Sequence, residues 1–171
     1  GQIRQTGIER LGRRGDGQVM TETVAVLGAS PKPERYSNQA IHLLRHYGHT
    51  VIPVNPIQSE IAGLPVAASL AAITQKVDTV TVYVSPSHLD PLVDGLLALK
   101  PTRVIFNPGA EHAAVAARLE KAGIATEEAC TLVLLHTRQS SARQSDIATF
   151  DAAELKKHYG RPENQLMTEW S

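Results

Sequence analysis

A short apolar run that ends in a glycine turn limits what this chain can fold into more than any other feature. Residues 24–27 are apolar without polar alternation, which is typical of a strand buried on both faces of a parallel sheet. Gly28 ends the run, and a loop with two prolines leads to residues 37–48, where apolar side chains recur at helical spacing. Ser37 is a natural N-cap of this helix and Gly48 a natural C-terminal stop. A strand, glycine turn and helix in this order are typical of the opening unit of a nucleotide-binding α/β domain.

The rest of the chain keeps alternating between strand-like and helix-like segments. Four more strands are expected, at residues 50–55, 78–84, 103–106 and 124–127, with a short extended piece at 65–69. Two further helices are expected, at residues 90–97, with Asp90 and Pro91 in the first turn, and at residues 110–122. This alternation predicts an α/β fold: a Rossmann-like, doubly wound, three-layer domain with a mainly parallel five-stranded sheet in the order 3-2-1-4-5.

Two segments leave their structure open. Pro53 cannot donate a hydrogen bond to a neighbouring strand, so its strand lies towards an edge of the sheet or the missing N–H is not needed there. Residues 131–137 are compatible with either a terminal helix or a strand.

Composition excludes several classes of partner and of structure. The 17 basic and 17 acidic residues cancel, so no broad electrostatic field indicates nucleic acid or an anionic membrane. The apolar runs are too short to span a bilayer. The single cysteine, Cys130, rules out an internal disulfide and agrees with a reducing, cytoplasmic location.

The chain divides into one domain and two flanking segments. Residues 20–138 form the predicted binding domain, a size that can bury a real core. Residues 1–19 are rich in glycine and arginine and are interpreted as a disordered leader, natural or added by cloning, with Met20 a plausible natural start. A basic docking arm is the alternative. Residues 139–171 are interpreted as a linker and C-terminal tail, with a candidate docking helix at 150–159.

Four predicted strand or turn ends carry a small polar residue followed by proline. They are Ser30–Pro31, Asn55–Pro56, Ser85–Pro86 and Asn107–Pro108. The carboxyl ends of parallel strands meet at one edge of the sheet, where ligands of this fold class bind. Short polar side chains there supply donors and acceptors, and the prolines stiffen the loops. Prolines that merely end strands are the alternative interpretation.

The first of these loops has the features of a phosphate site. Gly28 allows close backbone approach, and the N-terminus of the following helix offers free N–H groups and a partial positive charge. Arg35 has the geometry to grip a phosphate with two bonds, and Lys32 adds charge. Ser37 has two candidate roles, as helix cap or as phosphate ligand. The alternative for both cations is simple exposure to solvent.

The usual signatures of other nucleotide sites are missing. The sequence after the first strand is not Gly-x-Gly-x-x-Gly, and Asn55 stands where NAD enzymes of this fold commonly carry an acidic residue. The sequence also contains no glycine-rich Gly-Lys-Ser/Thr run of the P-loop type.

A family resemblance covers about residues 22–137. The matching pieces are Val-Leu-Gly-Ala-Ser30, Val-Asn-Pro56, residues 61–64, Ser69-Leu70, Phe-Asn-Pro-Gly109, Glu111 and residues 129–134. In this order and spacing, the chain resembles the small stand-alone CoA-binding proteins. The resemblance implies a Rossmann-like domain similar to the CoA-binding part of the succinyl-CoA synthetase α chain. The larger ligases carry further domains for acyl and phosphoryl chemistry, and we find no counterpart of these in the sequence.

The resemblance also implies which residues line a CoA site. They are Gly28, Ala29, Ser30, Arg35, Ser37, Asn55, Pro56, Ser85, Pro86, Asn107, Pro108 and Gly109.

The remaining reactive residues give weaker signals. His42 and His46 lie four residues apart on a helix without an evident Cys or acidic partner, so no metal site is expected. Cys130 follows the last predicted strand, and it is either a small buried apolar residue or a redox thiol that faces the thiol end of CoA. The sequence assigns no nucleophile–base pair and no carboxylate dyad.

We therefore expect a cytoplasmic protein that binds CoA or acyl-CoA and is non-catalytic on its own, with no nucleic acid or membrane partner. Homo-oligomers and protein partners stay open. One alternative is a diverged NAD(P)-dependent oxidoreductase or a ligase subunit. The other is a regulatory interaction module that binds a partner through residues 140–171.

Overall fold

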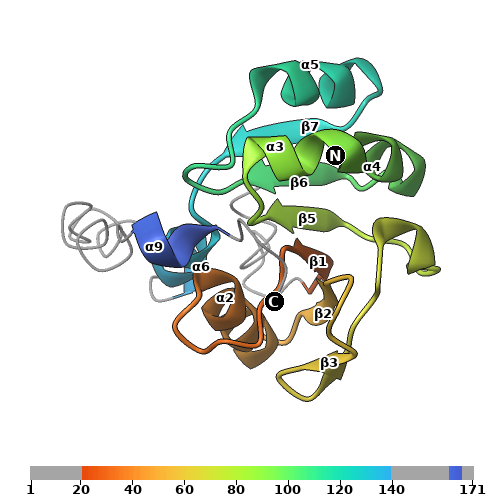
Figure 1. Ribbon diagram of the computed structural model, residues 1–171. Coiled ribbons are helices and arrows are strands. Elements are labelled where there is room, and N and C mark those ends of the chain that lie inside the picture. Colours follow the sequence, from red (N-terminus) through yellow and green to blue (C-terminus); the bar gives the residue numbers. More distant parts are fainter. Residues whose placement is uncertain (1–20, 140–161, 167–171) are drawn as a thin grey trace, which may run out of the picture.

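A five-stranded parallel sheet forms the centre of the molecule (Figure 1). The computed structural model describes residues 21–139 and 162–166. In chain order the strands are β1 Thr23–Leu27, β2 Thr50–Val54, β5 Thr79–Val82, β6 Arg103–Phe106 and β7 Ala125–Glu128. They lie in the order β2-β1-β5-β6-β7. Two short strands, β3 Glu60–Ile61 and β4 Leu64–Pro65, pair antiparallel in the connection between β2 and β5.

The helices and turns of the described residues connect these strands. They are α2 Tyr36–His46, η1 Leu70–Ala72, α3 Pro86–Leu89, η2 Asp90–Leu92, α4 Val93–Leu99, α5 Ala113–Lys121, α6 Thr131–Gln139 and α9 Pro162–Gln165. Within the described residues, no helix has the length and apolar character needed to cross a membrane.

The predicted doubly wound arrangement is confirmed. Ala67, in the predicted extended piece, makes a single parallel bridge to Val54, on the side of β2 away from β1. With this piece as the third strand, the sheet has the predicted 3-2-1-4-5 pattern followed by one more strand. The five full strands alone, numbered along the chain, run 2-1-3-4-5. Apart from that bridge β2 is the outermost strand, which agrees with the edge position that Pro53 favours.

Helices cover both faces of the sheet, which gives the predicted three layers (Figure 1). Side chains alternate along β1, so Val24 and Val26 belong to one core cluster while Ala25 and Leu27 belong to the other. The first cluster packs under α2 and α6, and the second under α4 and α5. Because β1 is buried on both faces, its residues Val24 to Leu27 are apolar without polar alternation.

The helix after β5 begins earlier than predicted. It starts at Pro86, not at Asp90, and passes through the 3-10 turn at Asp90–Leu92 before α4. Pro86 suits the first helical position because its fixed φ is helical and its missing N–H is not needed there. Pro91 has no N–H to continue the α-helical hydrogen-bond pattern, which accounts for the tighter turn. The Thr131 segment, left open by the sequence, is a helix.

The start of α2 also needs a correction. Arg35, not Ser37, is the N-cap residue, and it makes no side-chain capping bond. Ser37 lies in the first turn of α2 and is buried. Gly48 ends the helix as predicted, with φ +89° and its N–H donating to the Arg45 carbonyl oxygen. The predicted leader, the candidate docking helix at 150–159 and Trp170 lie outside the described residues.

Candidate functional site

The turn after β1 is pressed against the end of β5. Gly28 has φ +92°, and a Cβ at this position would lie 2.8 Å from Val84 Cγ1 and 2.9 Å from the Tyr83 carbonyl oxygen. The N–H groups of Gly28 and Ala29 both point to the Val54 carbonyl oxygen, at 3.3 and 3.2 Å. Gly28 is therefore required by the protein's own packing, and the ends of three strands meet around it.

The polar residue that follows β2 fixes the shape of the same turn. Asn55 is fully buried, and its Nδ2 donates to the Ala29 carbonyl oxygen at 2.9 Å. Its Oδ1 accepts from the N–H groups of Ile57 and Gln58, at 2.7 and 3.0 Å. Asn55 thus organises two loops of the predicted site from beneath. Pro56, the next predicted residue, is exposed.

Asn107 fixes the loop at the end of β6 in the same way. Its buried carboxamide donates to Thr81 Oγ1 at 2.7 Å and to the Val82 carbonyl oxygen at 2.9 Å. Its Oδ1 accepts from the Thr131 N–H at 2.9 Å, so it joins β5, β6 and the start of α6. Both strand-end asparagines are satisfied by protein groups, so we assign them to loop geometry.

Ser30 is fully buried and ordered by its own loop. Its Oγ accepts from the Lys32 N–H at 3.1 Å, and its carbonyl oxygen accepts from Asn38 Nδ2 at 2.9 Å. Asn38 is a buried site residue that the sequence reasoning missed. The signal for it was its place in the first turn of α2, where a polar side chain reaches back to the preceding loop. Lys32 itself is exposed.

The N-terminus of α2 contains an unsatisfied hydroxyl. Ser37 is 2% exposed, and its Oγ has no hydrogen-bond partner within the described part of the chain. A buried hydroxyl without a partner is costly, so such a group commonly marks a place where a ligand or water binds. Arg35, two residues earlier, is the N-cap residue and so belongs to this same end of the helix.

Arg35 is half-buried and already engaged. Its Nη1 donates to the carbonyl oxygens of Glu163 and Leu166, at 2.9 and 3.0 Å. Arg35 is therefore not simply exposed to solvent, which was the alternative to a phosphate-binding role. The Leu166 side chain also reaches Gly109, because its Cδ1 lies 3.0 Å from the position that a Cβ on Gly109 would take. The loops after β1 and β6 are thus linked through residues near the C-terminus.

The loop after β5 carries a hydrogen-bonded serine and histidine. Ser85 Oγ lies 2.8 Å from His88 Nδ1 and 3.3 Å from Ser87 Oγ. Ser85 is the residue before α3, so these bonds lie at the start of that helix. Pro86 follows it, half-buried.

A second histidine ties this region to α5. His112 Nδ1 accepts the Val115 N–H at 3.3 Å, so its Nε2 carries the ring proton and donates to Asp90 Oδ1 at 2.6 Å. The sequence showed no metal spacing for His88 or His112 and did not predict these hydrogen bonds, although the Ser-x-x-His spacing at a helix start is a signal for the first.

The loop after β6 is open to solvent beyond its buried asparagine. Pro108 and Gly109 are exposed, and Gly109 has φ +91°. The Gly109 N–H donates to Glu111 Oε1 at 2.8 Å. The backbone at Gly109 therefore forms an accessible surface, apart from the contact with Leu166.

Cys130 lies where the topology predicted, between β7 and α6. It is half-buried and packs against the core cluster under α2 and α6. Burial raises the pKa of the Cys130 thiol, while hydrogen bonds with the backbone of Val133 and Leu132 act in the opposite direction. The helix does begin at Thr131, but burial outweighs the effect of its N-terminus.

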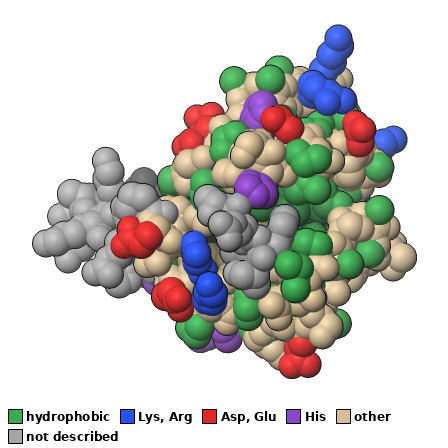
Figure 2. Space-filling model, viewed as in Figure 1, with side chains coloured by type: hydrophobic (Ala, Val, Ile, Leu, Met, Phe, Trp, Pro, Cys, Tyr) green, Lys and Arg blue, Asp and Glu red, His purple; other side chains and the backbone are tan. Residues whose placement is uncertain are grey.

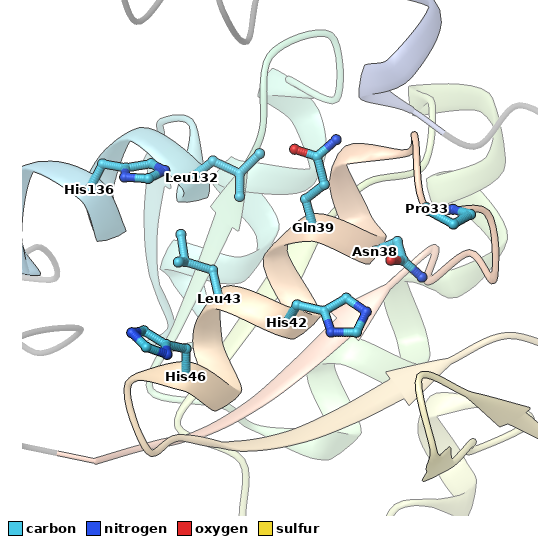
Figure 3. Close-up of a pocket in the computed structure, with 8 residues that line it drawn as sticks. All are labelled: Pro33, Asn38, Gln39, His42, Leu43, His46, Leu132 and His136. Carbon is cyan, nitrogen blue, oxygen red and sulfur yellow. The ribbon is translucent and has the colours of Figure 1, made fainter.

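A separate groove lies between α2 and α6 (Figure 3). It has a volume of about 530 Å³ and is lined by Pro33, Asn38, Gln39, His42, Leu43, His46, Leu132 and His136. None of the twelve residues predicted for the nucleotide site lines it. The part of the chain that the structure describes contains no group of three or more His, Cys, Asp or Glu side chains suited to a metal ion.

Acidic and basic side chains are scattered over the face shown in Figure 2, without a broad patch of one sign among the described residues there. Any anion at this face would therefore be held by local groups, such as a guanidinium or a helix N-terminus.

Comparisons with known proteins identify a family for this chain. A family model described as CoA binding domain matches residues 22–136. The structure of cell-free ID.343 from Thermus thermophilus is 36% identical with a TM-score of 0.64, and the match covers 68% of this chain and 89% of that chain.

Two curated relatives match shorter stretches. The ADP-forming acetate–CoA ligase I of Archaeoglobus fulgidus is 39% identical over 70 residues, which are 41% of this chain and 10% of the ligase. The uncharacterized protein YneT of Bacillus subtilis is 30% identical over 77 residues, 45% of this chain and 57% of YneT. The matches therefore span less than two thirds of either relative. The family match covers most of the chain and confirms the resemblance seen in the sequence: this chain belongs to the CoA binding domain family.

Proposed function

We propose that this protein binds CoA or acyl-CoA at the carboxyl edge of its sheet and has no catalytic activity on its own. The family assignment supports the ligand class. The observation that carries the site is the buried hydroxyl of Ser37, which lacks a hydrogen-bond partner in the described chain and lies in the first turn of α2.

The N-terminus of α2 has the chemistry to hold a phosphate of CoA. The partial positive charge at this end of α2 favours an anion, and the Ser37 hydroxyl can donate to a phosphate oxygen. Arg35 supplies a full charge at the same place, and a guanidinium suits the paired oxygens of a phosphate. The Gly28 turn adds a tightly held backbone against which the rest of the nucleotide can lie.

The loops after β2, β5 and β6 are proposed to hold the remainder of the ligand. Buried Asn55 and Asn107 fix these loops, while Pro56, Pro86 and Pro108 are exposed or half-buried, which suits contact with an adenine ring or pantetheine arm. The cytoplasm, where CoA is abundant and thiols stay reduced, is the proposed location.

The proposal of a non-catalytic role rests on what the site's polar groups already do. Ser85 and His88 bond each other at the start of α3, and His112 caps α5 while it holds Asp90. We assign these pairs to loop geometry, and propose that any acyl transfer requires another protein.

Calorimetric titration of one sample with CoA, acetyl-CoA and NAD tests the proposal. Because Asn55 replaces the acidic ribose ligand of NAD enzymes, CoA is expected to bind more tightly than NAD. NAD binding as tight as CoA would favour a diverged oxidoreductase. Failure to bind any of the three would favour an interaction module.

Substitution of Ser37 by alanine sharpens the test. Loss of one hydrogen bond to a charged phosphate is expected to weaken CoA about tenfold. The control is Thr102→Ala, which removes an exposed hydroxyl directly before β6, at the opposite edge of the sheet, and is expected to leave the CoA affinity unchanged. Equal CoA affinity in the Ser37 variant and in the unmodified protein would remove Ser37 from the site.

A further inference from the structure

The segment Pro162–Leu166 lies against the proposed CoA site. Its helix, α9, packs against α2 and is drawn beside α2 and α6 in Figure 1. The segment falls outside residues 22–136, which match the family model.

Arg35 links this segment to the phosphate end of the site. Both hydrogen bonds from its Nη1 go to carbonyl oxygens of the segment, those of Glu163 and Leu166. A carbonyl oxygen carries only a partial negative charge, whereas a phosphate carries a full one, so a guanidinium prefers the phosphate. The segment therefore binds the Arg35 guanidinium through carbonyl oxygens, and a phosphate can take their place.

Leu166 anchors the segment at the opposite side of the site. Its side chain packs against the core cluster under α4 and α5, and its Cδ1 lies 3.0 Å from where a Cβ on Gly109 would be, so it covers that side of the glycine. Gly109 otherwise offers exposed backbone to a ligand. The main chain of Leu166 bonds Arg35 while its side chain covers Gly109, so one residue spans two parts of the proposed site.

We propose that Pro162–Leu166 acts as an internal competitor: it occupies part of the CoA site, and CoA must displace it to reach Arg35 and Gly109. This inference rests on the proposed function. The apparent affinity for CoA is then reduced by the fraction of molecules in which the segment is bound. Weakening the packing of the Leu166 side chain is expected to release the segment and so to raise the apparent affinity for CoA.

The test compares three full-length proteins by calorimetric titration with CoA: the unmodified chain, Leu166→Ala and Leu99→Ala. Leu99 is the matched control, because it is also a half-buried leucine packed against the same cluster, but it ends α4 just before β6, at the opposite edge of the sheet. Leu166→Ala is expected to tighten CoA about threefold or more, and Leu99→Ala to leave the affinity unchanged.

The outcomes separate this inference from the proposed function. Unchanged or weaker binding of CoA to Leu166→Ala, with normal binding to the unmodified chain, overturns the competition and leaves the CoA site standing. Absence of CoA binding in all three proteins overturns both. Equal tightening in Leu166→Ala and Leu99→Ala also overturns the competition, because a general loosening of the core then explains the gain.

Hydrogen exchange gives a second readout that needs no variant. Backbone amides of residues 163–166 are expected to exchange faster when the unmodified chain is saturated with CoA, because the segment is displaced. Slower exchange would show that the segment closes over the ligand, which contradicts the proposal.

Discussion

Asn107 Oδ1 accepts a hydrogen bond of 2.9 Å from the Thr131 N–H, so the loop after β6 supports the first turn of α6. The same carboxamide donates to Thr81 Oγ1 and to the Val82 carbonyl oxygen in β5. A single buried side chain therefore connects two strands and a helix at the carboxyl edge of the sheet.

Replacing Asn107 by alanine is expected to lower the free energy of unfolding by about 2–4 kcal/mol, because buried donors and acceptors lose their partners. Urea denaturation measures this loss. Asn107→Asp keeps an oxygen that accepts from the Thr131 N–H but loses the N–H that donates to Val82. At neutral pH its free energy of unfolding is expected to be no higher than that of Asn107→Ala. A loss below about 1 kcal/mol for the alanine variant contradicts this role.

Gly28→Ala is expected to destabilise the protein by about 2 kcal/mol or more, through both its positive φ and the contact with Val84. Gly63→Ala separates the two causes, because Gly63 has φ +78° and no atom within 4 Å of an added Cβ. Thermal unfolding of both variants is the measurement. Equal losses would show that the contact with the end of β5 adds nothing.

Arg35→Ala is expected to weaken CoA by about 1.5–3 kcal/mol, the range for hydrogen bonds to charged groups. Arg45→Ala is the control, since Arg45 Nη1 also donates to a carbonyl oxygen, that of Ala62 at 3.2 Å, from the other end of α2. Titration with CoA compares them. The same affinity in both variants would remove Arg35 from the phosphate site.

Cys130 is expected to react slowly at neutral pH. Its raised pKa reduces the thiolate fraction, and thiolate is the reactive form. The rate of mixed-disulfide formation with CoA disulfide should keep rising through and above pH about 8.5, the ordinary thiol pKa. Mass spectrometry follows the adduct, with Cys130→Ser as the control. Fast modification that has levelled off by neutral pH would contradict burial as the dominant effect and favour a redox thiol.

Residues 1–19 are expected to be dispensable, because they carry little apolar surface to offset the entropy lost on ordering. A chain that begins at Met20 should unfold at the same temperature and bind CoA equally well. Loss of stability or of affinity would make the leader part of the domain.

The amino-acid sequence predicts local structure best at residue types that have few structural uses. Gly28 and Gly48 were placed at turns, and both have the positive φ that favours glycine. The predicted start of the helix after β5 was wrong. Pro86 and Pro91 both suit the first turn of a helix, and the prediction chose Pro91, whereas the helix starts at Pro86.

The sequence predicted which loops form the candidate site, but not the hydrogen bonds that hold these loops together. Asn55 and Asn107 were assigned to the ligand, and the structure shows both buried beneath the loops that they hold. A side chain's direction at the end of a strand depends on neighbouring strands, which a local pattern does not contain.

The sequence by itself determined the alternating architecture and the family, because these follow from apolar periodicity, turn residues and short motifs. The tertiary structure alone decided what Arg35 touches: its partner Leu166 lies 131 positions away and contributes a backbone carbonyl, which every residue has. Contacts of that kind leave no signal in residue type or spacing, since they arise from how the packed layers bring distant segments together.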